Sequence, residues 1–152
     1  MLQVGDNAPD FELISDENKP VKLSDFRGQR VVLFFYPKAA TPGCTTQACG
    51  FRDNYADIQA ANALVLGISP DQPDALTTWR AEESFPYPLL SDPDHTVAEQ
   101  YAVWGEKSMY GRTYMGIVRS HFVVDEAGKI ADIQYKVTPQ NSVANALKFL
   151  SN

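Results

Sequence analysis

A buried strand that leads into a helix carrying both cysteines constrains this chain more than any other stretch. Residues 31–36 are six consecutive apolar or aromatic residues, a run typical of a central strand buried on both faces. Pro37 ends the run. Thr41-Pro42 then predicts a helix start, because threonine is a good N-cap and proline suits the first helical position. Cys44 and Cys49, the only cysteines in the chain, fall inside this helix, so we expect the remainder to be a scaffold that positions it.

The spacing of apolar residues places Cys44 on the inward face of the predicted helix. Five residues recur along one helical face: Cys44, Ala48, Phe51, Tyr55 and Ile58. The first turn of a helix supplies unpaired N–H groups and the positive end of the helix dipole, and both favour the thiolate, which is the nucleophilic form of cysteine. We therefore interpret Cys44 as a reactive cysteine, with a small buried hydrophobic residue as the alternative.

Two further groups are expected to support a thiolate at Cys44. The Thr41 hydroxyl, three residues earlier, is expected to donate to the sulfur while its oxygen caps the helix. An arginine brought from elsewhere would add a fixed positive charge, and the sequence leaves Arg52, Arg112 and Arg119 open for this role. Arg119 is favoured because it falls early in a predicted central strand, where a buried charge requires an anion nearby. A structural ion pair is the alternative for Arg119.

Cys49 is too far from Cys44 to bond with it in an intact helix. Cα atoms five residues apart in a straight helix are ~8.6 Å apart, and their side chains point about 140° apart around the axis. A disulfide needs a Cα separation of roughly 4.4–6.8 Å. If Cys44 is oxidised to sulfenic acid, the helix must unwind locally before Cys49 condenses with it. Gly50, a poor helix former, follows Cys49 and would lower the cost of unwinding.

The remaining pattern predicts an α/β, thioredoxin-like fold in a single domain, residues 1–152. A βαβ unit followed by a ββα unit gives a central mixed β-sheet flanked by helices, here with an N-terminal β-hairpin extension. Residues 103–116 show no clear period and are expected to be a loop. The other predicted elements are a hairpin within 1–24, a strand at 63–68, a helix at about 73–84, a short strand at 89–90, a helix from 94 to 101, paired strands at 117–124 and 130–137, and a helix from 138.

The charge and composition of the chain argue against several classes of function. Thirteen basic and nineteen acidic residues give a net charge of −6, which disfavours a nucleic-acid partner. No apolar stretch approaches the roughly 18 residues of a membrane span, and the N-terminal residues lack the pattern of a secretory signal. Two cysteines in such a chain indicate a reducing, cytoplasmic location, where a cysteine pair is catalytic or redox-active rather than structural. The cysteines and histidines also lack the spacing of a structural zinc site.

The residues around the cysteines resemble the peroxiredoxins. The stretch from Pro37 through Thr41 to Cys44 is similar to the active-site motif of that family. The five-residue separation of the cysteines and four further segments are similar to the subfamily of the bacterioferritin comigratory protein, or peroxiredoxin Q: Phe51-Arg52-Asp53, Trp104-Gly105-Glu106-Lys107, Tyr110-Gly111-Arg112 and Gly116-Ile117-x-Arg119. The resemblance covers most of the chain, from Gly5-Asp6 to the last hairpin.

This resemblance implies a thiol-dependent peroxidase acting on hydrogen peroxide and organic hydroperoxides. Cys44 would be the peroxidatic cysteine, which attacks the peroxide and becomes a sulfenic acid. Thr41 and Arg119 would hold the thiolate and polarise the peroxide, and Pro37 would shape the pocket. Cys49 would be the resolving cysteine, and its intramolecular disulfide with Cys44 would be reduced by thioredoxin or a similar dithiol protein. No metal or organic cofactor is expected, and a bridge within one chain leads us to expect a monomer.

Two positions depart from the pattern of the subfamily. Gln47 stands where glutamate is expected, which removes a negative charge one turn from Cys44. His121 stands where a small hydroxyl residue is common, and it would share a strand face with Arg119. We expect His121 to be a hydrogen-bonded strand histidine, with tuning of the thiolate as the alternative.

Two other functions are compatible with the predicted fold. A disulfide oxidoreductase would usually carry Cys-x-x-Cys, whereas the spacing here is Cys-x-x-x-x-Cys, and an insulin-reduction assay separates the two activities. A non-catalytic binding module is the third possibility. Full peroxidase activity in a Cys44→Ser variant would favour the binding module, because the activity would then come from a contaminant.

Overall fold

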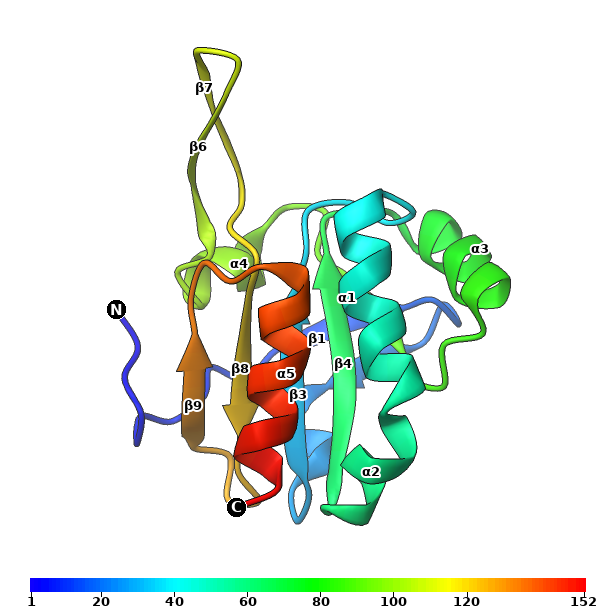
Figure 1. The fold of residues 1–152 in the computed structure, drawn as a ribbon, viewed down its shortest axis with the longest axis vertical. Helices are drawn as coiled ribbons and strands as arrows, with labels where there is room; N and C mark the ends of the chain where they lie inside the picture. The colour runs from blue at the N-terminus through cyan, green and yellow to red at the C-terminus, as the bar shows by residue number, and fades with distance from the viewer.

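A mixed β-sheet of seven strands runs through the computed structural model, which describes residues 1–152 (Figure 1). Its strands are β1 (Glu12–Ser15), β2 (Pro20–Lys22), β3 (Arg30–Phe35), β4 (Ala63–Ser69), β5 (Leu89–Ser91), β8 (Ser120–Val124) and β9 (Ile130–Gln134). The order across the sheet is β2-β1-β5-β4-β3-β8-β9. β3, β4 and β5 are parallel, while the hairpins β1–β2 and β8–β9 join antiparallel on the two sides. The predicted mixed sheet with an N-terminal hairpin is confirmed.

Helices cover both faces of this sheet (Figure 1). They are α1 (Pro42–Asp53), α2 (Tyr55–Ala60), α3 (Pro73–Glu83), α4 (Thr96–Gln100) and α5 (Pro139–Leu150), with a 3-10 turn η1 (Leu23–Phe26). One face packs against α1, α2, α3 and α5, and the other packs against α4 and η1. Side chains of β3 alternate between the two cores, with Phe34 in the first and Phe35 in the second, which explains why its sequence is apolar without interruption. None of the helices has the length and apolar character needed to cross a membrane.

Residues 103–116, expected to be a loop, instead form most of a second antiparallel sheet. β6 (Trp104–Met109) pairs with β7 (Arg112–Ile117) along its whole length, and the ribbon projects from one end of the body (Figure 1). Tyr110 and Gly111 make the turn with positive φ values of 53° and 77°. The loop prediction was wrong because these strands are largely exposed on both faces, so backbone pairing rather than alternating burial defines them.

Two helix boundaries also differ from those predicted. The helix with the cysteines does not continue to residue 58. It ends at Asp53, and Asn54 separates it from α2, with the Asn54 side chain donating to the Gly50 carbonyl at 2.8 Å. At α4, Asp92 rather than Asp94 satisfies the helix start, because its carboxylate accepts from two backbone N–H groups of the first turn.

Candidate active site

Cys44 lies in the first turn of α1, directly after the turn that follows β3, and is completely buried. Thr41 is the N-cap residue and Pro42 begins the helix, as predicted. Gly43 allows a close approach at this point, since a Cβ there would lie 3.1 Å from Arg119 Nη2 and 3.6 Å from Pro139 Cγ. The starts of α1 and α5 therefore meet beside Cys44, and the guanidinium of Arg119 lies at the same point, next to Gly43 and Cys44.

Arg119 is the arginine that the fold brings to Cys44. Its Nη2 donates to Cys44 Sγ at 3.5 Å, and its Nη1 donates to Gln47 Oε1 at 2.8 Å. Of the two alternatives, Arg52 is engaged by carboxylates farther along α1 and on α3, and Arg112 lies exposed at the tip of the ribbon. A positive charge at this distance stabilises negative charge on the sulfur.

The predicted strand at 117–124 is interrupted immediately before β8. Ile117 is the last residue of β7, and Ser120 is the first residue of β8, so Arg119 lies in the connection between them. The interruption arises because Ile117 pairs with the start of the ribbon, whereas Ser120 pairs with Phe35 of the central strand. The change of partner releases Arg119 from strand pairing and leaves it half-buried at the end of β3.

A buried chain of hydrogen bonds continues from Arg119 to His121. Gln47 accepts from Arg119 and donates through Nε2 to Ser142 Oγ at 2.9 Å, and Ser142 Oγ lies 2.8 Å from His121 Nδ1. Gln47, Ser142 and His121 are all completely buried. The serine oxygen accepts from Gln47 and keeps its own proton, so it can donate to His121 Nδ1, while His121 Nε2 is buried without a hydrogen-bond partner. Burial lowers the pKa of His121 to about 4, in keeping with a neutral ring.

The structure does not show the hydrogen bonds expected for Thr41. Its hydroxyl donates to the carbonyl of Lys38 at 2.7 Å, and its side chain makes no cap bond to α1. A hydroxyl has one proton, so this arrangement leaves none for Cys44. Pro37 follows β3 and is half-buried at the start of the turn, and the turn is held by the Ala39 N–H, which donates to a carboxylate oxygen of Asp71 at 2.8 Å.

Lys107 is a neighbour of the site that the sequence did not identify. It lies on β6, is half-buried, and donates through Nζ to the Ile117 carbonyl at 2.8 Å. Burial and the positive charge of Arg119 lower the pKa of Lys107, while Cys44 acts in the opposite direction. This position was missed because residues 103–116 were expected to be a loop.

Cys49 remains in the same unbroken helix as Cys44, and both are free thiols. It is half-buried, and its thiol donates to Glu83 Oε2, at the end of α3, over 3.2 Å. Burial, followed by the hydrogen bond to Glu83, raises the pKa of Cys49 to about 11. The two cysteines of α1 thus face opposite charges, a guanidinium at Cys44 and a carboxylate at Cys49.

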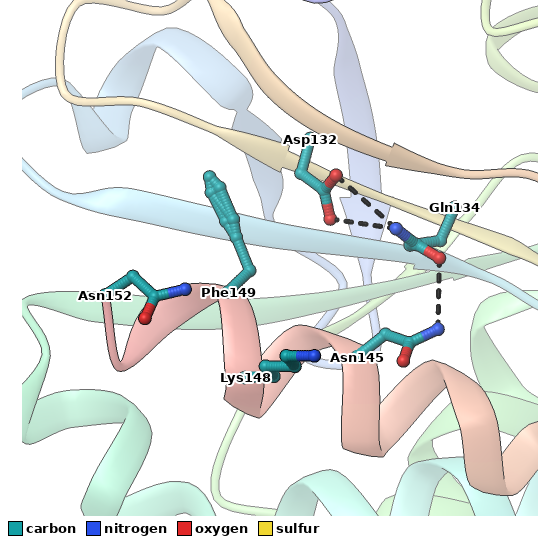
Figure 2. A pocket seen from close by; sticks show the side chains of 6 residues that line it. All are labelled: Asp132, Gln134, Asn145, Lys148, Phe149 and Asn152. Carbon is teal, nitrogen blue, oxygen red and sulfur yellow. Dashed lines mark hydrogen bonds between the residues drawn. The ribbon is translucent and has the colours of Figure 1, made fainter.

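A separate hollow between β9 and α5 contains none of these groups (Figure 2). Within it, Gln134 donates to Asp132, and Asn145 donates to Gln134 at 3.1 Å. Its lining is mostly polar: Asp132, Gln134, Asn145, Lys148, Phe149 and Asn152. None of the predicted site residues lines this hollow.

Comparisons with known proteins identify the family of this chain. Residues 4–133 match the model of the AhpC/TSA family. The peroxiredoxin Bcp of Escherichia coli K12 is 52% identical over 132 residues, which cover 87% of this chain and 85% of the relative. The structure of peroxidoxin BcpB from Mycobacterium tuberculosis superposes with a TM-score of 0.88 at 36% identity, over 99% of this chain and 97% of that one. A Xanthomonas campestris bacterioferritin comigratory protein, whose trapped intermediate/ligand complex structures give insights into its alkyl peroxide reduction activity, superposes with a TM-score of 0.87 at 30% identity, over 93% of this chain and 90% of that one.

Proposed function

The chain belongs to the AhpC/TSA family, as a thioredoxin-like peroxiredoxin of the Bcp and peroxiredoxin Q type, and we propose that it reduces peroxides with Cys44 as the attacking cysteine and Cys49 as the resolving one. Membership of this family makes the protein a thiol peroxidase. The observation that carries the assignment to Cys44 is the Arg119 guanidinium 3.5 Å from its sulfur, at the start of α1.

In the first step, the Cys44 thiolate attacks one oxygen of the peroxide. The S–O bond forms as the O–O bond breaks, and the second oxygen leaves as hydroxide or alkoxide and takes up a proton. Cys44 is thereby oxidised to a sulfenic acid, and the peroxide is reduced to water or to an alcohol and water by the end of the cycle. Arg119 stabilises the thiolate and the charge that develops on the leaving oxygen. Thr41, the N-cap residue of α1, and Pro37, in the turn before it, complete the proposed site.

In the second step, α1 unwinds locally and the two cysteines form an intramolecular disulfide. The ideal separation of ~8.6 Å between their Cα atoms exceeds what a disulfide spans, so the bond requires a change in the helix. A dithiol protein, thioredoxin or one like it, then reduces the bridge. This cycle needs one chain, one cytoplasmic reductant and no second subunit, so we propose a monomeric, single-domain enzyme.

Organic hydroperoxides are proposed substrates beside hydrogen peroxide. The supporting observation is the likeness to the Xanthomonas campestris protein, for which alkyl peroxide reduction is described. Relative rates with hydrogen peroxide, tert-butyl hydroperoxide and cumene hydroperoxide test this extension. Activity restricted to hydrogen peroxide would exclude it while leaving the role of Cys44 unaffected.

Mass spectrometry after one equivalent of peroxide tests the roles of the two cysteines. The wild type is expected to lose two hydrogens and to yield, after trypsin digestion, one peptide of residues 39–52 in which Cys44 and Cys49 are joined. Cys49→Ser is expected to retain a sulfenic acid on Cys44 that a dimedone-type reagent traps, and Cys44→Ser is expected to lose peroxide-dependent consumption of NADPH with thioredoxin and its reductase. An intact dimedone adduct at Cys49, or full turnover by Cys44→Ser, would contradict the assignment.

A further inference from the structure

Cys49 contacts Glu83, a residue outside the proposed peroxide site. We propose that Glu83 is a positioning residue for the resolving step: it holds Cys49 as a protonated thiol against α3 while α1 is intact, so that Cys49 becomes a nucleophile only after α1 unwinds. This inference rests on the resolving function proposed for Cys49. It concerns the state of that thiol before the disulfide forms.

The Glu83 carboxylate connects the part of α1 around Cys49 to the end of α3. The Cys49 thiol donates to Glu83 Oε2 at 3.2 Å. Arg52, one turn later on α1, contacts the same residue, since its Nη1 donates to the Glu83 carbonyl at 2.7 Å and lies 3.5 Å from Oε2. Glu83 is the last residue of α3, and its side chain is only 31% exposed. The carboxylate therefore has two partners, and both leave it if this part of α1 unwinds.

The charges around Cys49 favour the thiol over the thiolate. Glu83 and Asp53 are the acidic neighbours, and Arg52 is the basic one. Arg52, shared between both carboxylates with its Nε 2.9 Å from Asp53 Oδ1, acts in the opposite direction and lowers the pKa of Cys49, but burial and the hydrogen bond to Glu83 have larger effects. Tyr87, packed nearby, is itself kept neutral because burial raises its pKa. Burial and Glu83 together raise the pKa of Cys49, and no group facing its sulfur offers an unshared positive charge.

This arrangement sets the order of events during turnover. While α1 is folded, Cys49 is a weak nucleophile and Cys44, beside Arg119, is the favoured site of reaction. Unwinding separates Cys49 from Glu83 and returns the pKa of its thiol toward ~8.5, which raises its thiolate fraction at neutral pH by a factor on the order of 10². The released thiol gives its proton to solvent, and the thiolate attacks the sulfur of the Cys44 sulfenic acid. An S–S bond forms, the S–O bond breaks, and the departing hydroxide takes a proton to become water.

A variant with Cys49 as its single thiol tests this directly. In the Cys44→Ser background, Glu83→Gln keeps the size and hydrogen-bonding capacity of the side chain but removes its charge. Glu82→Gln is the matched control, because it makes the same change one residue earlier on α3, where the side chain is exposed. The rate of alkylation by iodoacetamide is measured from pH 7 to pH 12, with urea unfolding to confirm that each variant is folded.

Glu83→Gln is expected to move the midpoint of the pH profile down by about one unit or more and to raise the rate at pH 8 about tenfold, as expected for loss of a close negative charge. Glu82→Gln is expected to match its parent. A Glu83→Gln profile with the midpoint of the control would overturn the proposal. A faster rate at every pH with an unchanged midpoint would overturn it too, because looser packing rather than charge would then explain the reactivity.

The same substitution in the chain with both cysteines separates this proposal from the proposed function. There, Glu83→Gln is expected to form the Cys44–Cys49 disulfide several-fold faster after a pulse of peroxide than Glu82→Gln does. If the wild type forms no such disulfide, the resolving function of Cys49 fails. In that case, a shifted alkylation midpoint would still show that Glu83 keeps the Cys49 thiol protonated. The proposed control of disulfide formation by Glu83 would be overturned.

Discussion

At the scale of single residues, the two departures from the subfamily pattern turn out to be linked in space. Gln47 and His121 lie at the two ends of one buried chain, joined through Ser142. A carboxylate only accepts hydrogen bonds, whereas a glutamine amide also has donors that must be satisfied when buried. Ser142 accepts from that amide, and neutral His121 can accept the serine proton. The chain holds Gln47 with its oxygen toward Arg119, and hence holds the guanidinium at Cys44.

Removing Ser142 is expected to weaken both folding and catalysis. Ser142→Ala leaves Gln47 Nε2 and His121 Nδ1 buried without a partner, which should cost about 1–3 kcal/mol in the free energy of unfolding. The rate of Cys44 oxidation should fall about tenfold, because Arg119 is no longer held in place. Urea unfolding and stopped-flow oxidation measure the two effects. Ser108→Ala, on the exposed ribbon, is the control, and equal rates for the two variants would exclude a positioning role for the chain.

His121 is expected to make stability fall as the solution becomes acidic. Its folded pKa of about 4 lies below the ordinary value of 6.5, so between these values the unfolded chain binds the proton more readily. The contribution is complete above pH 6.5 and is lost as the pH falls toward 4, with a total of about 3 kcal/mol. Urea unfolding from pH 4.5 to 7.5 should show a steeper decline for the wild type than for His121→Asn. Parallel curves would show that His121 is not buried as a neutral ring.

At the scale of elements, α1 carries two cysteines in opposite environments and packs closely on α5. Its sequence places Cys44 near one end and Cys49 about one and a half turns later, beyond bonding distance. Gly50 was expected only to ease unwinding, but it also makes room for α5. A Cβ at this position would lie 2.7 Å from Val143 Cγ2. Gly50 therefore allows α5 to pack closely on the folded helix, in addition to its expected role in lowering the cost of unwinding.

Gly50→Ala is therefore expected to destabilise the protein although alanine favours helices. The clash with Val143 should cost about 1–3 kcal/mol, which outweighs a gain of at most about 1 kcal/mol in helix propensity. Combining it with Val143→Ala should restore part of the loss, giving a favourable coupling between the two changes in a double-mutant cycle. Additive effects in urea unfolding would show that the two helices do not press on each other here.

At the scale of the whole molecule, one sheet contains both the N-terminal hairpin and the last hairpin, and α1 packs on one of its faces. β1 pairs with β5 on one side of the parallel strands, and β8 pairs with β3 on the other. Only the ribbon of β6 and β7 stands apart from this sheet (Figure 1). Trp104, at its base, stacks on the ring of His95 with the centroids 3.8 Å apart, and this contact ties the ribbon to α4.

The continuous sheet predicts a single cooperative unfolding transition. In a Trp104→Phe variant, fluorescence reports on Trp79, which is buried against the core on α3, and far-UV circular dichroism reports on the whole fold. The two urea midpoints are expected to coincide, as for a single domain of this size. Separate midpoints would show that residues 1–152 contain more than one folding unit. Sedimentation at the same protein concentration tests the proposed monomer.

The sequence by itself determined the strand, the turn and the helix that carries Cys44, together with the α/β class and the distance that keeps Cys49 from bonding within an intact helix. These follow from local properties, namely an apolar run, an N-cap followed by proline, and the fixed rise of a helix. The tertiary structure selected Arg119, which the sequence favoured over Arg52 and Arg112, as the partner of Cys44, and it alone decided that Glu83 lies at Cys49. Such contacts depend on how distant segments pack, and a turn or helix motif does not encode which side chain arrives beside it. The ribbon of β6 and β7 escaped prediction for a related reason, because backbone pairing between exposed strands leaves little trace in the pattern of apolar residues.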